Sequence, residues 1–233
     1  MHWDKELFDT EWPQTISRYD EKLSTAKKIA ALVKDGETIG FGSGSTSFIA
    51  VKTIVERIKG EGLSIYAIPT SKEIKAICIA FGVPTLSILE AKPDWCFDGA
   101  DEVDPKGWLI KGRGGAMFNE KMIISNAPKA YILVDKTKFV SKLCESFPIP
   151  VECIPESVTS VKSRLSEMGA ADIQLRPAGK SKDGPVITEN GNYILDVKFD
   201  TVHEDLEKNI KLICGVLETG LFIGYNTEIV SCD

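Results

Sequence analysis

Hydrophobic residues in the first 135 positions switch between helical spacing and short continuous runs. Apolar residues three or four positions apart predict two helices, over 19–33 and 71–81. They also predict a helix that carries Phe48 to Ile58 and another that begins near Ala116. The continuous runs predict buried strands over 38–42, 63–68, 95–98 and 131–135. Because strands that alternate with helices favour a parallel arrangement, we expect an α/β fold with a mainly parallel sheet flanked by helices.

The pattern changes after three closely spaced prolines, Pro148, Pro150 and Pro155. Beyond them we expect strands over 151–154, 173–176 and 193–197, and helices over 156–168 and 205–213. Asn190-Gly191 is typical of a hairpin turn. The last apolar runs, at 220–222 and 228–230, are expected to rejoin the first sheet. We therefore predict an α/β main domain over 1–143 and 219–233, and a small α+β lid domain over 144–218.

The segment from Asp98 to Lys121 concentrates charged side chains around a glycine run. Its charged members are Asp98, Asp101, Glu102, Asp104, Lys111 and Glu120, and its glycines are Gly112, Gly114 and Gly115. Carboxylates at the C-terminal end of a strand, followed by a glycine loop, are how open α/β sheets build active sites. Glycines let backbone N–H groups approach a ligand, while the lysine and carboxylates remain for proton chemistry. A solvated acidic turn would explain any one of these residues, but not the whole segment.

A second glycine-rich loop, from Gly40 to Ser47, follows a predicted strand and opens a predicted helix. That context favours anion binding at a helix N-terminus. It is not a Walker loop, because no lysine precedes Ser45 and Thr46, and the three-glycine dinucleotide pattern also fails. The hydroxyls and amides of Ser43, Gly44, Ser45 and Thr46 suit one monoester phosphate, although a plain turn with a helix cap is the alternative.

Composition narrows the class of protein further. The 233 residues are 43% hydrophobic, enough for one sizeable core and a second small domain. A net charge of −6 and a pI near 5.2 argue against nucleic-acid and membrane-surface binding, although lysines can still gather around an anionic small molecule. No apolar run reaches membrane-spanning length, and the N-terminus is charged, so we expect neither a membrane span nor a signal segment.

Cysteines and histidines exclude several kinds of site. The six cysteines show no CxxC pair and no metal-ligand spacing, which favours a reduced, cytoplasmic protein without structural disulfides. The only histidines are His2 and His203, so neither a histidine-dependent hydrolase nor a multi-histidine metal site is expected. Acid–base chemistry must fall to carboxylates, lysines or hydroxyls.

Several segments together resemble the type A ribose-5-phosphate isomerases. They are GSGSTS from Gly42, DGADE from Asp98, KGxGGA followed by EK from Lys111 to Lys121, VDxxK ending at Lys138, FPxPVE from Phe147 and GPVITENGNYILD from Gly184. The resemblance runs from about Lys22 to Val230. It implies a main domain with a lid and a metal-independent, cofactor-free interconversion of ribose 5-phosphate and ribulose 5-phosphate, a step of the pentose phosphate pathway. It also suggests a homodimer or homotetramer.

The resemblance implies a role for individual residues of this chain. Glu120 resembles the general base, Asp98 and Asp101 the active-site aspartates, and Lys111 the lysine that faces the sugar oxygens, with the amides of Gly112, Gly114 and Gly115. Lys22, Ser45, Thr46 and Lys138 resemble the phosphate-binding residues. Arg113 stands where the family commonly has glycine, and Asn119 where it commonly has arginine.

Other charged and aromatic residues have plainer interpretations. We expect Glu102 and Asp104 to be structural or solvent-facing, Asp135 to be a strand-end or capping residue, and the tryptophans, Trp3 and Trp108 among them, to be packing residues. Arg176, Lys180 and Lys182 either approach the phosphate or lie in a solvated loop.

Two rival functions stay open on the sequence. Sugar-phosphate sensors of bacterial repressors share this kind of sheet, but they usually carry a helix-turn-helix ahead of it, and only about 35 residues precede the first predicted strand here. A sugar-phosphate deaminase or lactonase is the enzyme alternative. Known deaminase chemistry depends on histidine, and no histidine lies near the motifs of this chain.

Overall fold

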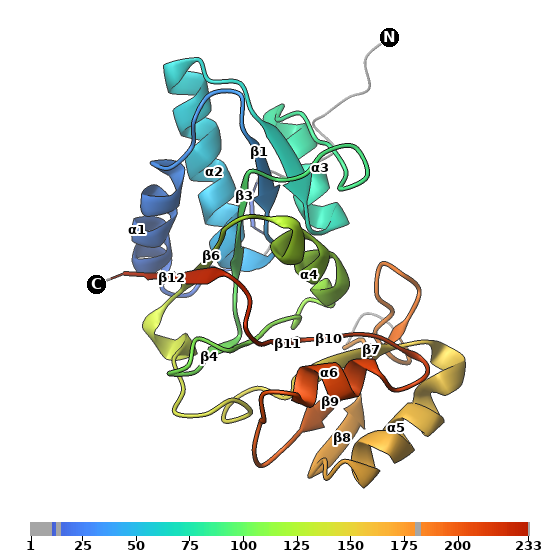
Figure 1. Cartoon of the computed structure of the whole chain (residues 1–233). Coiled ribbons are helices and arrows are strands. Elements are labelled where there is room, and N and C mark those ends of the chain that lie inside the picture. Colours follow the sequence, from blue (N-terminus) through green and yellow to red (C-terminus); the bar gives the residue numbers. More distant parts are fainter. Residues whose placement is uncertain (1–10, 13–14, 180–182, 233) are drawn as a thin grey trace. The chain divides into compact units, whose positions relative to one another are not determined.

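A computed structural model describes residues 11–12, 15–179 and 183–232, which form two compact units (Figure 1). The first unit takes in Met1–Gly99, Asn119–Thr137 and Asn226–Asp233, and the second takes in Ala100–Phe118 and Lys138–Tyr225. Four residues discussed above, His2, Trp3, Lys180 and Lys182, lie outside the described residues. The predicted domain boundaries, at 143/144 and 218/219, stay a prediction.

The first unit is built on a five-stranded sheet with the strand order β12-β6-β3-β1-β2. Every neighbouring pair in this sheet is parallel, as the alternation of strands and helices predicts. Its elements are α1 (Tyr19–Ala30), β1 (Thr38–Phe41), α2 (Gly44–Glu61), β2 (Tyr66–Pro69), α3 (Lys72–Phe81), β3 (Trp95–Gly99), most of α4 (Met117–Asn126), β6 (Ala130–Val134) and β12 (Thr227–Ser231).

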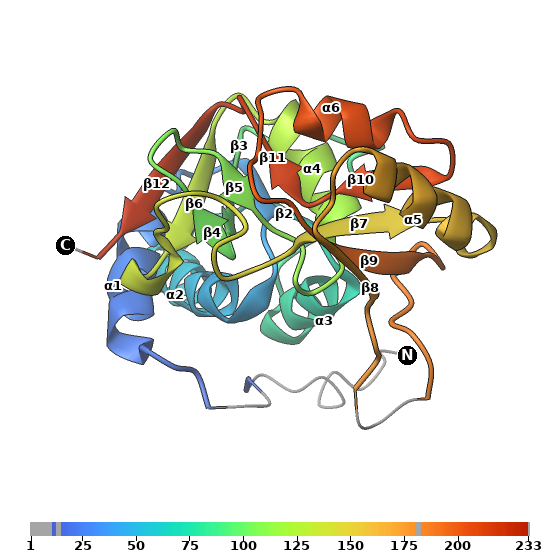
Figure 2. The same ribbon diagram turned by 90° about the horizontal axis from the view of Figure 1, so that it is seen from below.

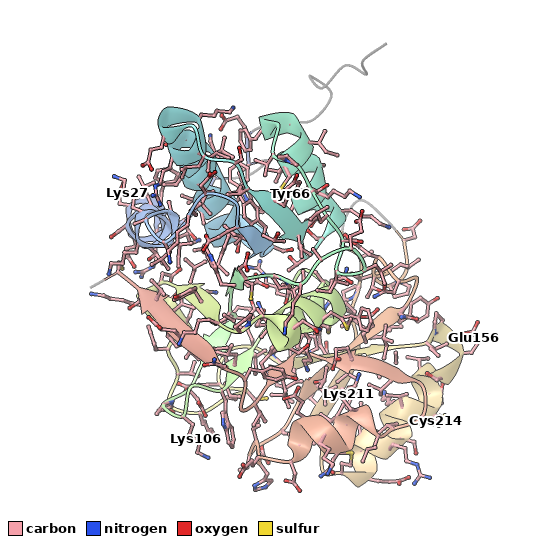
Figure 3. All side chains as sticks on the ribbon, turned by 45° about the horizontal axis from the view of Figure 1, so that its top comes forward. Lys27, Tyr66, Lys106, Glu156, Lys211 and Cys214 are labelled. Carbon is pink, nitrogen blue, oxygen red and sulfur yellow. The ribbon has the colours of Figure 1, made fainter. Side chains whose placement is uncertain are left out.

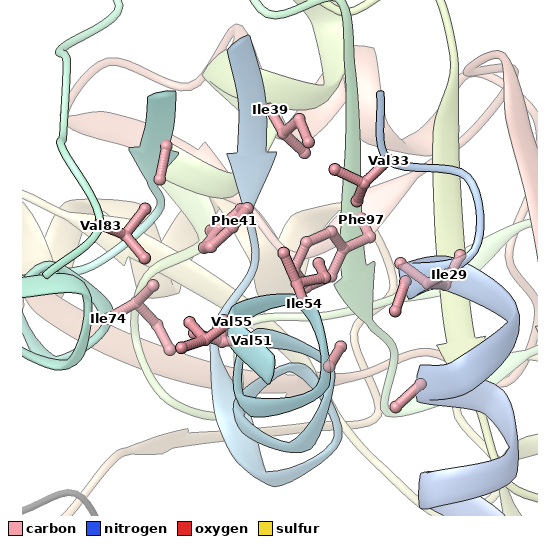
Figure 4. Packing of buried hydrophobic residues seen from close by; sticks show 14 of the residues in the cluster. Ile29, Val33, Ile39, Phe41, Val51, Ile54, Val55, Ile74, Val83 and Phe97 are labelled. Atoms are coloured by element: carbon pink, nitrogen blue, oxygen red, sulfur yellow. The ribbon is translucent and has the colours of Figure 1, made fainter. Parts of the chain in front are cut away.

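Alternation along β1 explains how the helices cover this sheet. Ile39 and Phe41 are fully buried on one face, where they belong to the same apolar cluster as side chains from α1, α2 and α3. Figure 4 shows this core, with Phe41 and Phe97 of the strands facing the side chains of α2. Gly40 faces the other way, and a Cβ there would lie only 2.5 Å from Ile123 of α4. The predicted mainly parallel sheet flanked by helices is therefore confirmed.

The second unit contains a four-stranded antiparallel sheet with the order β10-β7-β9-β8 (Figure 2). Two short helices, α5 and α6, supply buried side chains to the same apolar cluster as this sheet. The elements of the unit are β4 (Glu102–Val103), β5 (Leu109–Ile110), β7 (Ile149–Cys153), the 3-10 helix η2 (Pro155–Ser157), α5 (Val158–Glu167), β8 (Asp172–Leu175), β9 (Tyr193–Lys198), α6 (Leu206–Lys211), β10 (Val216–Thr219) and β11 (Leu221–Phe222). The 3-10 helix η1 (Lys136–Lys138) spans the boundary, and only its last residue, Lys138, belongs to the second unit.

The two faces of this antiparallel sheet differ in chemistry. Ile149, Val151 and their partners Val197 and Leu195 belong to the apolar cluster shared with α5 and α6. Because side chains alternate along a strand, Ile194 and Asp196 of β9 and Glu152 of β7 lie on the opposite face.

One predicted topology is only half right. β12 does rejoin the parallel sheet, beside β6. The run at 220–222 does not, because β11 pairs antiparallel with β5 and makes a small three-stranded sheet with β4. A continuous apolar run indicates a buried strand but not its partner, and β4 and β5 have only two residues each, too few to show any periodicity.

Candidate active site

Asp98 lies at the C-terminal end of β3, directly against the loop that follows β1. Its buried carboxylate accepts hydrogen bonds through Oδ1 from the backbone N–H of Ser43, at 3.1 Å, and of Gly99, at 2.8 Å. A Cβ on Gly42 would lie 2.4 Å from the same oxygen, so the close approach of the loop requires glycine at this position. Asp98, the first residue of the acidic segment, thus meets the loop after β1 at adjacent parallel strands.

The first turn of α2 gathers the residues predicted to bind phosphate. The Nζ atom of Lys22, in α1, donates to Oγ of Ser45 at 3.1 Å, and Lys22 is only 6% exposed. The hydroxyls of Ser43 and Thr70 are 2.6 Å apart, and Ser45 and Thr46 are half-buried while Gly44 is exposed. Lys22, which the resemblance implies as a phosphate-binding residue, therefore lies next to the hydroxyl cluster. A cation, several hydroxyls and the positive end of an 18-residue helix converge here.

Glu120 is a buried carboxylate in the first turn of α4. The strand after this helix, β6, runs parallel to β3, so α4 must return the chain from the carboxyl edge of the sheet. The first turn of α4 therefore lies at the edge where Asp98 and the Ser43–Thr46 loop also lie. Within the first unit, the structure brings the predicted base, one predicted aspartate and the predicted phosphate loop to one edge of one sheet.

The glycine loop of the second unit is held by backbone geometry. Gly112 and Gly115 have φ angles of +91° and +85°, and the N–H of Gly115 donates to the carbonyl of Gly112 at 3.0 Å, which closes a turn. Gly112 cannot be replaced, since a Cβ there would lie 2.8 Å from that of Met117. Arg113 is not among the positive-φ residues and its side chain is exposed, which explains why this turn tolerates arginine where relatives of the type A family commonly have glycine.

Two further predicted residues belong to the same loop. Oδ2 of Asp101 accepts the N–H of Arg113 at 3.1 Å, so Asp101 contacts the glycine loop. Lys111 is buried, and its Nζ lies 5.6 Å from the centre of the Phe222 ring, a cation–π distance. The second unit therefore brings together Asp101, Lys111 and the glycines. Nζ of Lys138, which belongs to the same unit, lies 5.1 Å from the ring centre of Phe147.

The remaining carboxylates of the acidic segment are structural. Glu102 is fully buried and accepts three backbone N–H groups, from Cys144, Ser146 and Phe147. Asp104 accepts the N–H groups of Lys106 and Trp108 and so fixes a tight turn. Both contacts agree with the structural interpretation of these two residues.

Asp135 and Trp108 also have structural contacts. Asp135 follows β6 and accepts the N–H of Thr137 at 3.0 Å, as a capping residue does. Trp108 packs against the apolar cluster of the second unit, and Nζ of Lys106, labelled in Figure 3, lies 4.1 Å from the centre of its ring. The expected roles in capping and packing are consistent with these contacts.

The described residues include neither a candidate metal cluster nor a helix suited to span a membrane. No group of three or more His, Cys, Asp or Glu side chains among them has a geometry that could hold a metal ion. Within the same part of the chain, no helix is both long and apolar enough to cross a membrane.

Sequence reasoning missed one residue and left another open. Arg176 was either a phosphate ligand or a loop residue, and its guanidinium is in fact paired with Asp196 and with the carbonyls of Gly112 and Arg113. Asp196 was not singled out at all. The signal was present in the run Ile194-Leu-Asp-Val197, because alternation puts Asp196 on the face opposite Leu195 and Val197.

A family model and several known proteins resemble this chain over most of its length. A family model described as ribose 5-phosphate isomerase A (phosphoriboisomerase A) matches residues 66–233. The ribose-5-phosphate isomerase A of Methanocaldococcus jannaschii is 46% identical over 219 residues, which are 92% of this chain and 95% of that protein. The solved structure of the enzyme from the same organism has a TM-score of 0.88 at 42% identity and covers 92% of this chain and 96% of that one. A solved D-ribose-5-phosphate isomerase in complex with phospho-erythronic acid has a TM-score of 0.87 at 37% identity, with the same two coverages.

Proposed function

This chain belongs to the ribose 5-phosphate isomerase A family, and from that premise we propose that it interconverts D-ribose 5-phosphate and D-ribulose 5-phosphate without a metal or cofactor. Aldose–ketose isomerisation moves a proton between adjacent carbons while the neighbouring oxygens exchange carbonyl and hydroxyl roles. It needs a base that reaches both carbons, a positive group facing the enediolate, and a group that handles the oxygen protons. The observation that carries the proposal is the edge of the parallel sheet, where Asp98, Glu120 and the Ser43–Thr46 loop lie.

Glu120 is proposed as the base. It is a carboxylate in the first turn of a helix, and it is only 5% exposed, which keeps bulk water from competing for the proton. His203 is the only histidine among the described residues, and it lies far along the sequence from the segments that carry the proposed site. One carboxylate can remove the proton from one carbon and return it to the next.

Lys111 is proposed as the cation that stabilises the enediolate, together with the amides of Gly112, Gly114 and Gly115. Preset donors aimed at developing negative charge are often the largest single contribution to catalysis. The glycine turn supports the proposal, because hydrogen bonds within the protein fix its backbone geometry.

Asp98 and Asp101 are proposed to open the furanose ring by exchanging a proton with the ring oxygen and the first hydroxyl. In the structure, Oδ1 of Asp98 accepts two backbone N–H groups, which orients the carboxylate. A proton transfer at a ring oxygen depends on such orientation as well as on acid strength.

The phosphate is proposed to bind at Ser43, Gly44, Ser45 and Thr46, with Lys22 and Lys138 as cations. The contact between Lys22 and Ser45 supports this assignment for Lys22. A similar protein was solved with phospho-erythronic acid, whose name carries both a phosphate and an acid group. Binding energy from the phosphate, remote from the reacting carbons, would hold the sugar in its reactive pose.

Location, assembly and a lid are also part of the proposal. We propose a cytoplasmic enzyme, supported by six cysteines that are all free thiols. We propose a homodimer or homotetramer, to be checked by sedimentation at several protein concentrations.

Residues 144–218 are proposed to act as the lid, which limited proteolysis with and without substrate would test. No nucleic-acid or membrane partner is proposed for this acidic chain.

The deciding experiment is turnover. The purified protein should convert ribose 5-phosphate to a ketose, followed by absorbance of the ketose product, and should keep its rate after prolonged treatment with EDTA. Free ribose should be a poor substrate. A rate that EDTA abolishes and a divalent ion restores would overturn the metal-free mechanism, and absence of any ketose would overturn the function itself.

A further inference from the structure

The guanidinium of Arg176 makes most of its possible hydrogen bonds with residues of the second unit. Its Nε donates to Oδ2 of Asp196 at 2.8 Å, and a second guanidinium nitrogen pairs with the other oxygen of the same carboxylate. The remaining terminal nitrogen donates to the carbonyls of Gly112, at 3.1 Å, and Arg113, at 2.8 Å. Four of the five N–H groups that arginine carries are therefore in use. Arg176 is not a phosphate ligand in this arrangement.

The register of two strands creates this contact. Arg176 directly follows β8, and its N–H donates to the carbonyl of Ile194 in β9 at 2.9 Å. Asp196 lies two residues further along β9, on the same face as Ile194 and opposite the apolar cluster. The glycine turn lies against this face too, since a Cβ on Gly115 would be 3.2 Å from the side chain of Ile194.

Two consecutive peptide groups of the glycine turn are fixed by these contacts. The peptide between Gly112 and Arg113 is held at both ends, its carbonyl by Arg176 and its N–H by Asp101. The peptide between Arg113 and Gly114 has its carbonyl held by Arg176. A trans peptide is planar, and its N–H points opposite to its C=O. The N–H of Gly114 is therefore directed away from Arg176, on the free side of the turn.

We propose that Arg176, braced by Asp196, is a positioning residue that presets the direction of the Gly114 N–H as a donor to the sugar oxygens. The inference rests on the proposed function, in which the glycine amides stabilise the enediolate. A donor that is preset for charge appearing during the reaction stabilises the transition state more than the ground state, so its loss lowers kcat more than it raises KM. Lysine cannot replace Arg176, because a single ammonium cannot bridge a carboxylate bidentately and also reach two carbonyls.

The test compares Arg176→Ala, Arg176→Lys and Asp196→Asn with Arg164→Ala, a matched control. Arg164 forms an exposed ion pair with Glu167 on α5 of the same unit. In the first two variants kcat should fall by about 10- to 100-fold, the range typical of lost outer contacts at a reactive group, with KM changed by less than about threefold. Asp196→Asn should show a smaller fall. Arg164→Ala should match the wild type.

Amide hydrogen exchange gives a reading that does not depend on activity. The N–H of Arg113 donates to Asp101 and that of Gly115 to the carbonyl of Gly112, and exchange at both should quicken in both Arg176 variants and stay unchanged in Arg164→Ala. Added guanidinium ion, far below an unfolding concentration, should restore part of the rate of Arg176→Ala, because the site is partly open at 14% side-chain exposure for Arg176 and 20% for Asp196.

Several outcomes would overturn the inference. Unchanged exchange in the turn would mean that Arg176 does not hold it, and a raised KM with normal kcat would make Arg176 a binding residue instead. If Arg176→Ala does not fold, Arg176→Lys decides, because it keeps a charge beside Asp196. A wild type without isomerase activity would remove the proposed function, yet the exchange comparison would still decide whether Arg176 holds the turn.

Discussion

Glu120 is the residue on which the proposed chemistry depends most, since no other carboxylate in the first turn of α4 can take its place. Glu120→Gln keeps the shape and part of the hydrogen bonding of the side chain but cannot accept a proton from carbon. We expect kcat to fall by at least about 10²–10⁴, the range for loss of a general base, with KM nearly unchanged. The measurement is ketose formation, with exchange of the carbon-bound hydrogen in deuterated water as a second reading.

Glu102→Gln is the matched control for that variant. Glu102 is also a buried carboxylate, but its three N–H partners belong to the segment 144–147, far along the chain from the proposed base. Its replacement should lower the free energy of unfolding by about 1–3 kcal/mol while the folded protein keeps its kcat. A Glu120→Gln enzyme with more than about a tenth of wild-type turnover would move the base elsewhere, and Asp101 would be the next candidate.

Residue chemistry was the part of the site that the sequence predicted best. Asp98 and the serines of the phosphate loop stand in motifs that the family resemblance assigns to one site, and Lys22 was assigned by that resemblance as well. Arg176 and Asp196 are different. They are 20 residues apart and meet only through the register of β8 and β9, which no local pattern specifies.

At the scale of elements, the first turn of α2 can be tested one hydroxyl at a time. Ser45→Ala removes the acceptor of Lys22 and a proposed donor to the phosphate. We expect substrate binding to weaken by about 1–3 kcal/mol, seen mainly as a raised KM for ribose 5-phosphate, because the phosphate is held alike before and during the reaction. Steady-state kinetics with a phosphorylated and an unphosphorylated sugar measure the effect.

The same helix offers its own control in Ser47→Ala. The hydroxyl of Ser47 is fully buried and, among the described residues, has no hydrogen-bond partner. Removing it should leave KM unchanged and should not reduce stability, since a buried hydroxyl without a partner costs free energy. Equal effects of the two substitutions on KM would argue that the loop serves folding rather than phosphate binding.

Helices and strands with a clear period were predicted close to where they lie, and those without one were not. The predicted helix over 19–33 ends earlier, at Ala30, because the N–H groups of Leu32 and Val33 donate to carbonyls only three residues back, as in a tighter 3-10 turn. β4 and β5 were missed, and β11 was assigned to the wrong sheet. Strand pairing depends on contacts across the fold, so an apolar run predicts burial better than it predicts a neighbour.

At the scale of the whole molecule, each unit is assembled from distant stretches of chain. The first unit joins three segments and places the last strand, β12, beside β6. Local periodicity cannot reveal such an assembly, because it describes which face is buried and not what covers it. Each unit nevertheless has its own apolar core, and each core contains a buried thiol.

The two buried thiols make the stability of the protein sensitive to alkaline pH. Burial raises the pKa of Cys78, in the first core, from 9.0 to about 12, and that of Cys153, in the second core, from 9.0 to about 11. In the unfolded chain both thiols ionise near pH 9. Stability contributed by the protonated thiols is thus fully present below pH 9 and is lost as the pH rises toward 11 and 12, because only the unfolded state releases its protons in that window.

Denaturant unfolding at a series of pH values between 8 and 11 tests this against Cys78→Ala and Cys153→Ala. Above pH 9, the free energy of unfolding of the wild type should fall by about 1.4 kcal/mol per pH unit more steeply than that of either variant. Each variant lacks one buried thiol, so it releases one proton fewer on unfolding. The small cavity left by each substitution adds an offset that does not depend on pH. Parallel pH profiles for the wild type and a variant would show that the corresponding thiol is not shielded in its core.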